Sequence, residues 1–234
     1  MANKDVSIIF PVFNERGSIE RVIQEWADLF HKNSIQAEVI VCEDGSKDGT
    51  SEFLREIQKK YQLVLDQSKE RRGYGRAVIS GMEKASGAYI FCVDSDGQYD
   101  PMDFLKLWKV RNHQEIFVGC RSNRQDSFLR KLYSGTFKLF FSILFSTNVR
   151  DPSSPFVLFH RSYVMILNRY LQYLLEGFWW GFTAACVKKK IRIRELPILH
   201  RDRLEGNTKV YSAGKIPSIA FRNGLGLLRL RFAK

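Results

Sequence analysis

The sequence predicts an α/β fold with a mostly parallel central sheet and helices on both faces. Short apolar runs rich in β-branched residues recur through the first half of the chain, and segments with apolar residues at helical spacing separate them. Such alternation builds parallel sheets with right-handed crossovers. The 234 residues contain no repeat or low-complexity linker, so we expect one domain over residues 1–234.

The expected elements follow one another in regular order. Strands are expected at Val6–Phe10, Glu38–Cys42, Leu63–Leu65, Tyr89–Val93 and Ile116–Gly119. Helices are expected between them at Ser18–Phe30, Thr50–Tyr61, Tyr74–Ala85 and Pro101–Arg111, and a longer helix at Phe128–Phe145. The second half is expected to cover the edge of the sheet.

The composition limits the function classes only weakly. Lysine and arginine total 37 against 25 aspartates and glutamates, which gives a net charge of +12. This surplus attracts nucleic acid, anionic lipid or phosphorylated small molecules without choosing among them. Much of it lies after residue 187, so the basic half is C-terminal.

Cysteine usage and hydropathy bear on the compartment. The four cysteines form no CxxC pair, and three lie within or at the end of apolar runs, which favours reduced thiols and a cytoplasmic location. The first apolar run is too short for a signal-peptide core, and no stretch of about 18 uncharged apolar residues occurs. We therefore expect no transmembrane helix.

Polar segments follow three of the expected strands directly. They are Pro11–Glu15, Glu43–Thr50 and Asp94–Gln98. Because the carboxyl ends of parallel strands meet at one edge of a sheet, these segments are expected to converge on a ligand site.

The chemistry of these segments suits a metal-bound diphosphate. Asp96 and Gln98 offer oxygens that Mg²⁺ or Mn²⁺ would share with phosphate, while Asp94 faces a nucleoside. Asp44 could accept a hydrogen bond from a nucleobase, and the glycine-rich segment Arg71–Arg76 could admit a phosphate. The structural alternatives are acidic turns, helix caps and solvated arginines.

Taken in order, these segments resemble family 2 glycosyltransferases with a GT-A fold. Four further segments, at 119–121, 130–134, 149–156 and 203–209, narrow the resemblance to polyprenyl-phosphate sugar synthases of the dolichyl-phosphate mannose synthase type. The matches run from Val6 to Lys209 and cover nearly the whole chain.

The resemblance implies a metal-dependent, inverting hexosyltransferase. It would move a hexose, mannose as the first guess, from GDP-mannose or a UDP-hexose to a dolichyl-type polyprenyl phosphate. Residues 1–120 would form the nucleotide-sugar-binding half, and residues 121–234 the acceptor half with its basic amphipathic C-terminus.

The resemblance also assigns roles to particular residues. The nucleotide sugar would be bound by Pro11, Phe13, Glu15, Asp44, Asp94 and Asp96, and the divalent metal, Mg²⁺ or Mn²⁺, by Asp96 and Gln98. The acceptor phosphate would be bound by Arg121, Arg130, Ser134, Arg203 and Lys209, of which all but Lys209 would join Asp96 as catalytic residues. A phosphate is already an oxyanion, so positioning and charge neutralisation suffice and no catalytic base is assigned.

The chain departs from the commoner family patterns at two places. Gly97 stands where leucine is frequent in the metal motif, and Ser154-Pro155 replaces the frequent Ser-Gly or Cys-Gly. Because of these departures, the sequence does not identify which sugar is transferred or which acceptor receives it.

Two segments bear on membrane contact. Tyr133–Phe145 is apolar almost all round but spans only about 18 Å, so it is either a core helix or an interfacial one. Ile216–Phe232 mixes leucines with arginines, which suits anionic headgroups or an ordinary surface helix. We expect peripheral attachment to the cytoplasmic face of a membrane.

Two other functions compete with this hypothesis. The first keeps the fold but transfers from UDP-glucose or another UDP-sugar to a polysaccharide or protein. The second, ranked well below, is a non-enzymatic basic module that binds nucleic acid or membrane. It leaves the acidic strand-end segments unexplained, so no nucleic-acid partner is expected.

Overall fold

The computed structural model describes residues 4–122, 128–201 and 216–233, with the side chains of 128–134 and 216–217 left aside. The strands are β1 (Val6–Val12), β2 (Ala37–Asp44), β3 (Val64–Ser68), β4 (Tyr89–Cys92), β5 (Glu115–Ser122), β6 (Val157–His160) and β7 (Arg192–Leu199). The helices are α1 (Ile19–Lys32), α2 (Thr50–Tyr61), α3 (Tyr74–Lys84), α4 (Pro101–Val110), α5 (Phe128–Phe145), α6 (Tyr163–Leu171), α7 (Phe178–Lys188) and α8 (Ile216–Phe232).

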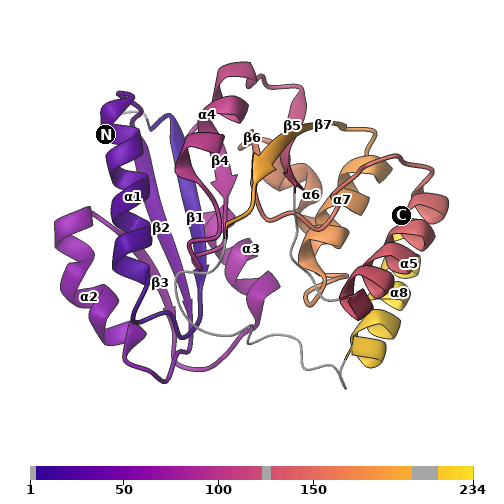
Figure 1. The fold of residues 1–234 in the computed structure, drawn as a ribbon, viewed down its shortest axis with the longest axis horizontal. Helices are drawn as coiled ribbons and strands as arrows, with labels where there is room; N and C mark the ends of the chain where they lie inside the picture. The colour runs from indigo at the N-terminus through magenta and orange to yellow at the C-terminus, as the bar shows by residue number, and fades with distance from the viewer. Residues whose placement is uncertain (1–3, 123–127, 202–215, 234) are drawn as a thin grey trace.

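The strands form one twisted sheet in the order β3-β2-β1-β4-β6-β5-β7 (Figure 1). Neighbouring strands pair in parallel except β6, which is antiparallel to both β4 and β5. The predicted α/β class with a mostly parallel sheet is confirmed. Because six of these strands run in the same direction, their carboxyl ends meet at one edge, where β6 begins.

The alternation of strands and helices expected through residue 119 is found, and the elements that the sequence analysis did not anticipate lie in the second half. Strand β6 enters between β4 and β5, and β7 extends the sheet beyond β5. Two helices, α6 and α7, were also not anticipated. Strand β6 is a buried apolar run of only four residues, too short to be told from other apolar stretches, and β7 carries charged residues along the edge of the sheet.

Each face of the sheet has its own apolar core. Helices α1, α2 and α4 cover one face, where Trp26 packs its ring against Phe91 at 5.2 Å and Phe104 at 6.1 Å between centroids. Helices α3, α6 and α7 cover the other face. Helix α7 is buried almost all round, which settles Trp179 as a core residue with 6% of its surface exposed.

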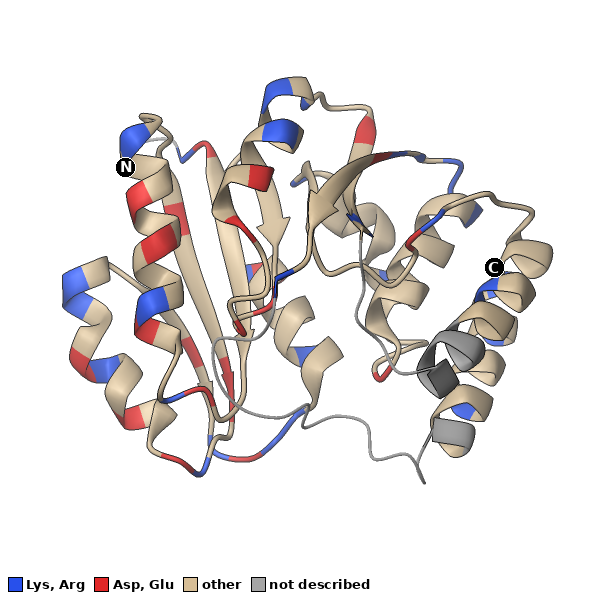
Figure 2. Cartoon of the chain, in the orientation of Figure 1, with Lys and Arg blue, Asp and Glu red and all other residues tan. Residues whose placement is uncertain are grey.

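Helices α5 and α8 lie side by side at the outside of α7, on the right in Figure 1. Their inward residues, such as Phe141 and Leu227, are fully buried. Their outer faces instead expose large apolar side chains, and all the charged residues of α8 are arginines, drawn as blue segments in Figure 2. None of the helices within the described ranges has the length and apolar character needed to cross a membrane.

Candidate active site

A cleft opens at the carboxyl ends of β1, β2 and β4. All six residues predicted to bind a nucleotide sugar line it: Pro11, Phe13, Glu15, Asp44, Asp94 and Asp96. Val12, Arg71, Tyr74, Ala77 and Ser95 complete the lining. The expected convergence of the three polar segments is therefore observed, because the parallel strands bring their ends together.

Asp44 fixes the segment that precedes α3. Its carboxylate, at the end of β2, accepts hydrogen bonds from the backbone N–H of Arg72 at 2.6 Å and of Gly73 at 3.0 Å. The Nε atom of Arg71 lies 4.0 Å from the same carboxylate. The residue is 3% exposed, so these bonds compensate for burying its charge.

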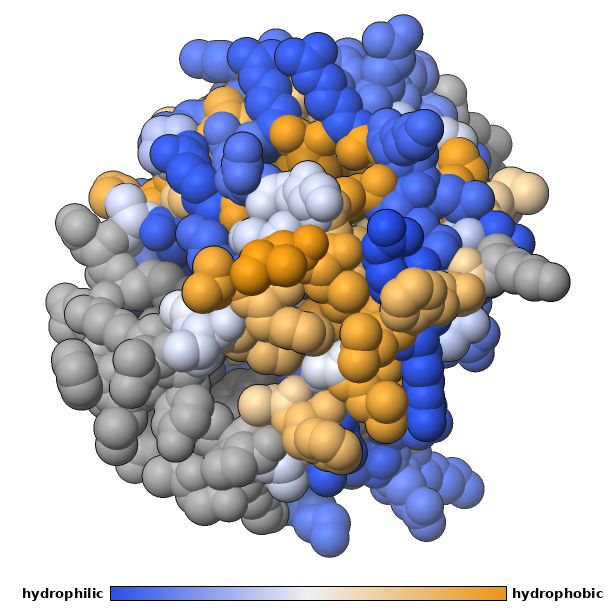
Figure 3. All heavy atoms as spheres, turned by 90° about the vertical axis from the view of Figure 1, so that its right-hand side faces the viewer, coloured by the Kyte–Doolittle hydropathy of each residue, from blue (hydrophilic) through white to orange (hydrophobic). Residues whose placement is uncertain are grey.

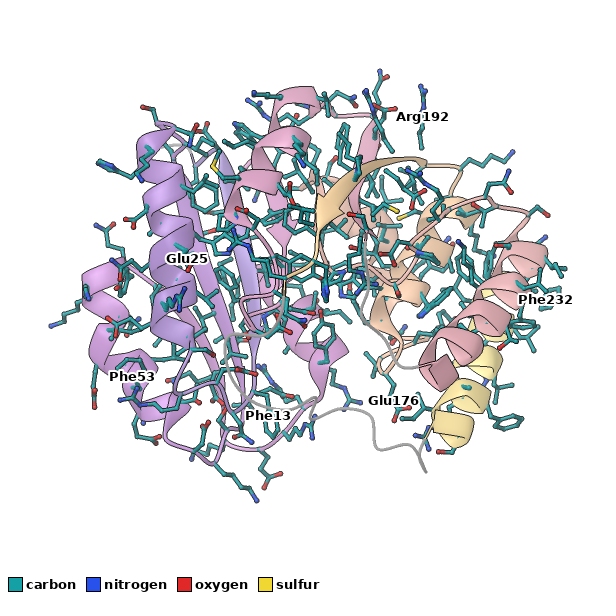
Figure 4. The ribbon with its side chains drawn as sticks, in the orientation of Figure 1. Phe13, Glu25, Phe53, Glu176, Arg192 and Phe232 are labelled. Carbon is teal, nitrogen blue, oxygen red and sulfur yellow. The ribbon has the colours of Figure 1, made fainter. Side chains whose placement is uncertain are left out.

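Phe13 forms the outer wall of the cleft. Its ring lies below the ends of the parallel strands (Figure 4), and the guanidinium of Arg71 sits 4.1 Å from the ring centroid. This cation–π contact joins the loop after β1 to the loop before α3. A flat aromatic ring beside an arginine suits a planar base and its phosphates.

The acidic segment Asp94–Gln98 makes a tight turn after β4. The hydroxyl of Ser95 donates to the carbonyl of Pro11 at 2.9 Å, and the backbone N–H of Gln98 donates to Asp96 at 3.1 Å. Gly97 has a φ of 75°, in the left-handed region that favours glycine. The departure from leucine at this position therefore has a backbone reason.

Gln98 connects the acidic segment to the end of β7. Its side-chain amide donates to the carbonyl of Arg201 at 3.1 Å, and the backbone N–H of Arg201 donates back to the Gln98 carbonyl at 2.8 Å. One N–H of the amide is thus engaged, and the amide oxygen is the atom of Gln98 that suits a cation.

A hydrogen-bonded chain reaches Asp94 from the other half of the protein. The hydroxyl of Tyr74 donates to Asp94 at 2.6 Å, and the indole N–H of Trp179 donates to that hydroxyl at 2.7 Å. Burial, followed by the Asp94 carboxylate, raises the pKa of Tyr74 well above its ordinary value, so the hydroxyl stays protonated. Part of the Tyr74 ring still lines the cleft.

Arg121, at the end of β5, is held by a buried carboxylate. Its Nε and Nη2 atoms each donate to Asp151 at 2.8 Å, and Nη2 also donates to the Ser153 hydroxyl at 2.8 Å. Burial lowers the pKa of Arg121, but Tyr99, Asp151 and Asp94 outweigh it and the net shift is upward. Arg121 lies near the carboxyl end of β5, at the same edge of the sheet as the cleft.

The loop that carries Asp151 is itself tied to β7. Glu195 accepts the backbone N–H of Arg150 at 2.9 Å and that of Asp151 at 2.8 Å. Strands β5 and β7 and the 149–155 loop therefore form one rigid corner at the cleft edge of the sheet.

The other predicted acceptor residues are not placed by the structure. The side chains of Arg130 and Ser134, in the first turns of α5, lie outside the described part, as do Arg203 and Lys209 altogether. Their roles stay predictions.

Three residues of the site were missed by the sequence analysis. Tyr74 stands inside the glycine-rich segment, where only the glycines drew notice. Asp151 lies in a segment used for the resemblance, and Trp179 lies in an apolar segment that carries no motif. Each acts through a partner far along the chain, 20 to 105 residues away, which no local pattern reveals.

Comparison with known proteins defines the class to which this fold and cleft belong. The profile of Glycosyl transferase family 2 matches residues 7–170, which is more than half of the chain. The chain therefore belongs to glycosyl transferase family 2, as the sequence motifs predicted.

The curated relatives point to one group within the family. An undecaprenyl-phosphate 4-deoxy-4-formamido-L-arabinose transferase of Pectobacterium atrosepticum is 32% identical over 139 residues, 58% of this chain and 42% of the relative. The transferase of the same name from Serratia proteamaculans is 24% identical over 232 residues, 93% of this chain and 66% of the relative. The chain thus spans less than two thirds of the length of these relatives.

Solved structures confirm the GT-A fold. Glucosyl-3-phosphoglycerate synthase from Mycobacterium tuberculosis, in complex with phosphoglyceric acid, has a TM-score of 0.72 at 16% identity. The superposition covers 98% of this chain and 80% of the synthase chain. The same enzyme with Mn²⁺, UDP and glucosyl-3-phosphoglycerate has a TM-score of 0.71 at 16% identity over the same shares of the two chains. Mannosyl-3-phosphoglycerate synthase from Rubrobacter xylanophilus has a TM-score of 0.68 at 13% identity over 97% and 73% of the two chains.

Proposed function

We propose that this protein transfers a sugar from a nucleoside diphosphate sugar to a polyprenyl phosphate. The observation that carries the proposal is the cleft at the strand ends, where Asp44, Asp94 and Asp96 lie together, with Arg121 near the end of β5 at the same edge of the sheet. The relatives named as undecaprenyl-phosphate transferases support the acceptor.

A divalent cation fits the oxygen donors of the cleft. Among the described residues, no three acidic, histidine or cysteine side chains gather into a complete metal site. Small hard cations are commonly held by one or two carboxylates together with substrate phosphates and water, and Asp96 lines the cleft and would supply such a carboxylate. Gln98, the second predicted ligand, lies two residues further on and is not among the residues that line the cleft, so its amide oxygen stays a predicted ligand. When bound, Mg²⁺ or Mn²⁺ would neutralise charge on the diphosphate.

The reaction needs no proton transfer to begin. An oxygen of the lipid phosphate attacks the anomeric carbon, the bond from that carbon to the diphosphate breaks, and its electron pair leaves with the nucleoside diphosphate. Attack from the face opposite the leaving group inverts the anomeric centre. The residues contribute alignment and charge stabilisation, which suffice for an acceptor that is already an anion.

Among the residues predicted to bind the acceptor phosphate, Arg121 is the one whose side chain the structure describes. Asp151 engages one edge of its guanidinium with two parallel bonds, which fixes the orientation of the remaining N–H donors. In this proposal Arg121 contributes positive charge at a fixed point, and Arg130, Ser134, Arg203 and Lys209 complete the acceptor site. Residues 1–120 then supply the donor half and residues 121–234 the acceptor half.

The donor sugar is best tested with a panel. Mannose was the first guess, whereas the relatives' names give 4-deoxy-4-formamido-L-arabinose and the solved structures are of glucosyl and mannosyl transferases. We propose to offer purified protein UDP-4-deoxy-4-formamido-L-arabinose, UDP-glucose and GDP-mannose, with Mg²⁺ or Mn²⁺ and undecaprenyl or dolichyl phosphate. Lipid-linked sugar supports the proposal, and transfer only to non-lipid acceptors contradicts it.

The acceptor lipid requires contact with a membrane, and the outer faces of α5 and α8 suit one. We call this surface the α5–α8 face. Its exposed apolar residues are Leu139, Phe140, Ile143, Phe221, Leu225, Leu228 and Phe232. Figure 3 shows them as an apolar patch with hydrophilic residues at its border, and Phe232 points away from the body of the protein (Figure 4).

Charge complementarity favours an anionic lipid surface as the occupant of this face. Helix α8 carries Arg222, Arg229 and Arg231, of which Arg222 pairs with Glu176, and no acidic residue occurs on either helix. Aromatic and leucine side chains between arginines are typical of helices that lie in the headgroup region. We therefore propose peripheral attachment through the α5–α8 face.

The double variant Phe221→Asp/Phe232→Asp is expected to weaken binding to vesicles containing phosphatidylglycerol about tenfold or more. Both rings are about three-quarters exposed, so the fold should tolerate the change. Vesicle flotation measures the effect. Met102→Asp is the matched control, because Met102 lies on α4 and is 60% exposed. Equal losses of vesicle binding in the control and in the double variant would contradict attachment through the α5–α8 face.

A further inference from the structure

The hydroxyl of Tyr74 has a fixed direction. The indole N–H of Trp179 can only donate, so at 2.7 Å from Trp179 the hydroxyl oxygen must accept. The single proton of the hydroxyl is then left for Asp94, at 2.6 Å. The hydrogen bonds therefore all point in one direction: Trp179 donates to Tyr74, and Tyr74 donates to Asp94. This direction requires an acceptor oxygen on Asp94.

Packing holds both donors of this chain in place. Trp179 packs against Phe178 at 5.0 Å and Phe182 at 5.4 Å between ring centroids, and it does not line the cleft. The ring of Phe178 also meets that of Tyr74 edge-on at 6.5 Å. Trp179 is thus a buried anchor in α7, outside the reach of a ligand in the cleft.

The backbone that carries Tyr74 is anchored on two sides. Asp44 accepts the N–H groups of the two preceding residues. On the other side, a Cβ added at Gly75 would lie 2.6 Å from the carbonyl oxygen of Leu175, so the start of α3 touches the segment before α7 directly. Tyr74 consequently joins the donor half to the acceptor half at a point where neither can shift freely.

We propose that Tyr74 is a positioning residue that holds Asp94 in the orientation that binds the donor nucleotide, and that Trp179 sets the direction of its hydroxyl. This inference rests on the proposed function, since it assigns Asp94 to donor binding. Without the hydroxyl, the Asp94 carboxylate loses a short hydrogen bond that helps to fix its orientation. Because Asp94 would bind the nucleotide equally before and during the reaction, the loss should appear in KM rather than in kcat.

Tyr74→Phe is expected to raise KM for the nucleotide sugar about tenfold, the scale of a hydrogen bond to a charged group, with kcat nearly unchanged. The donor is whichever sugar nucleotide the wild-type protein uses in the panel described above. A thermal melt accompanies each variant to separate loss of fold from loss of binding.

Trp179→Phe tests whether the tryptophan acts through the tyrosine. Alone it should raise KM, while the double variant Tyr74→Phe/Trp179→Phe should show no larger KM than Tyr74→Phe. Trp180→Phe is the matched control, because Trp180 packs on Phe137 and Phe141 instead. If Tyr74→Phe fails to fold, Trp179→Phe alone carries the test, because it leaves the tyrosine in place.

The outcomes separate this inference from the proposed function. An active wild-type protein whose KM is unchanged by Tyr74→Phe, or by Trp179→Phe where the tyrosine variant does not fold, overturns the positioning role alone. Additive effects of the two substitutions overturn the one-way chain, and a loss confined to kcat shows a catalytic rather than a positioning role. A wild-type protein that turns over no donor overturns the proposed function, and with it this inference.

Discussion

Asp96→Asn is expected to reduce sugar transfer about a thousandfold, the scale lost when a preorganised charge-stabilising group is removed from a reaction centre. Asp96 lies in the cleft with 7% of its surface exposed. Asparagine keeps the shape and still offers an oxygen to the N–H of Gln98, so the turn should survive. What disappears is the negative charge that would hold a divalent cation against the diphosphate.

Initial rates at saturating Mg²⁺ or Mn²⁺, with circular dichroism as a check of folding, measure this effect. Asp28→Asn makes the same change of charge on the exposed side of α1 and should retain full activity. A folded Asp96→Asn protein with wild-type rates would show that the acidic segment only forms a turn.

Asp151→Ala is expected to lower the free energy of unfolding by about 3–5 kcal/mol, because it leaves a buried guanidinium without its partner. The side chains of Arg121 and Asp151 are only 10% and 7% exposed, and two parallel bonds join them. The same substitution removes the carboxylate that orients Arg121, so transfer should fall as well. Urea denaturation followed by fluorescence measures the change in stability.

The exposed ion pair of Arg222 and Glu176 is the contrasting case. Its side chains are 57% and 51% exposed, and such pairs contribute roughly 0–1 kcal/mol. Glu176→Gln should therefore leave the denaturation midpoint almost unchanged. If Asp151→Ala were equally mild, the corner formed by β5, β7 and the 149–155 loop would not be a stabilising unit.

The sequence was sufficient for the first half of the fold because each element there has a strong local pattern. Strands β1, β2 and β4 are buried apolar runs, and α1 shows a clear apolar stripe with Trp26 at its centre. Pro101 at the start of α4 was expected and is found, after Asp100 as the N-cap.

The second half resisted prediction because long-range pairing determines it. The four residues of β6 become a strand only by pairing with β4 and β5, which precede it by dozens of residues. Strand β7 begins with arginines alternating with apolar residues at the edge of the sheet, and the sequence analysis counted these arginines only as part of the basic C-terminal half. Local periodicity carries no information about such partners.

The site shows the same contrast between what local patterns predict and what long-range contacts determine. Strand-end position alone predicted that Asp44, Asp94 and Asp96 would share a cleft, and they do. What the sequence could not show is how these groups are held, since Tyr74 and Asp151 reach their partners only in the folded chain. Motifs identify groups that could touch a ligand, whereas the groups that orient them emerge from the tertiary structure.

The central claim is that Asp44, Asp94 and Asp96 form a metal-assisted site for a nucleoside diphosphate. Calorimetric titration of the protein with UDP and GDP, in Mn²⁺ and again in EDTA, tests it most directly. We predict binding of one nucleotide per chain that is strong with Mn²⁺ and is lost both in EDTA and in Asp96→Asn. Failure of both nucleotides to bind in Mn²⁺, or binding that EDTA and Asp96→Asn leave unchanged, would contradict the claim.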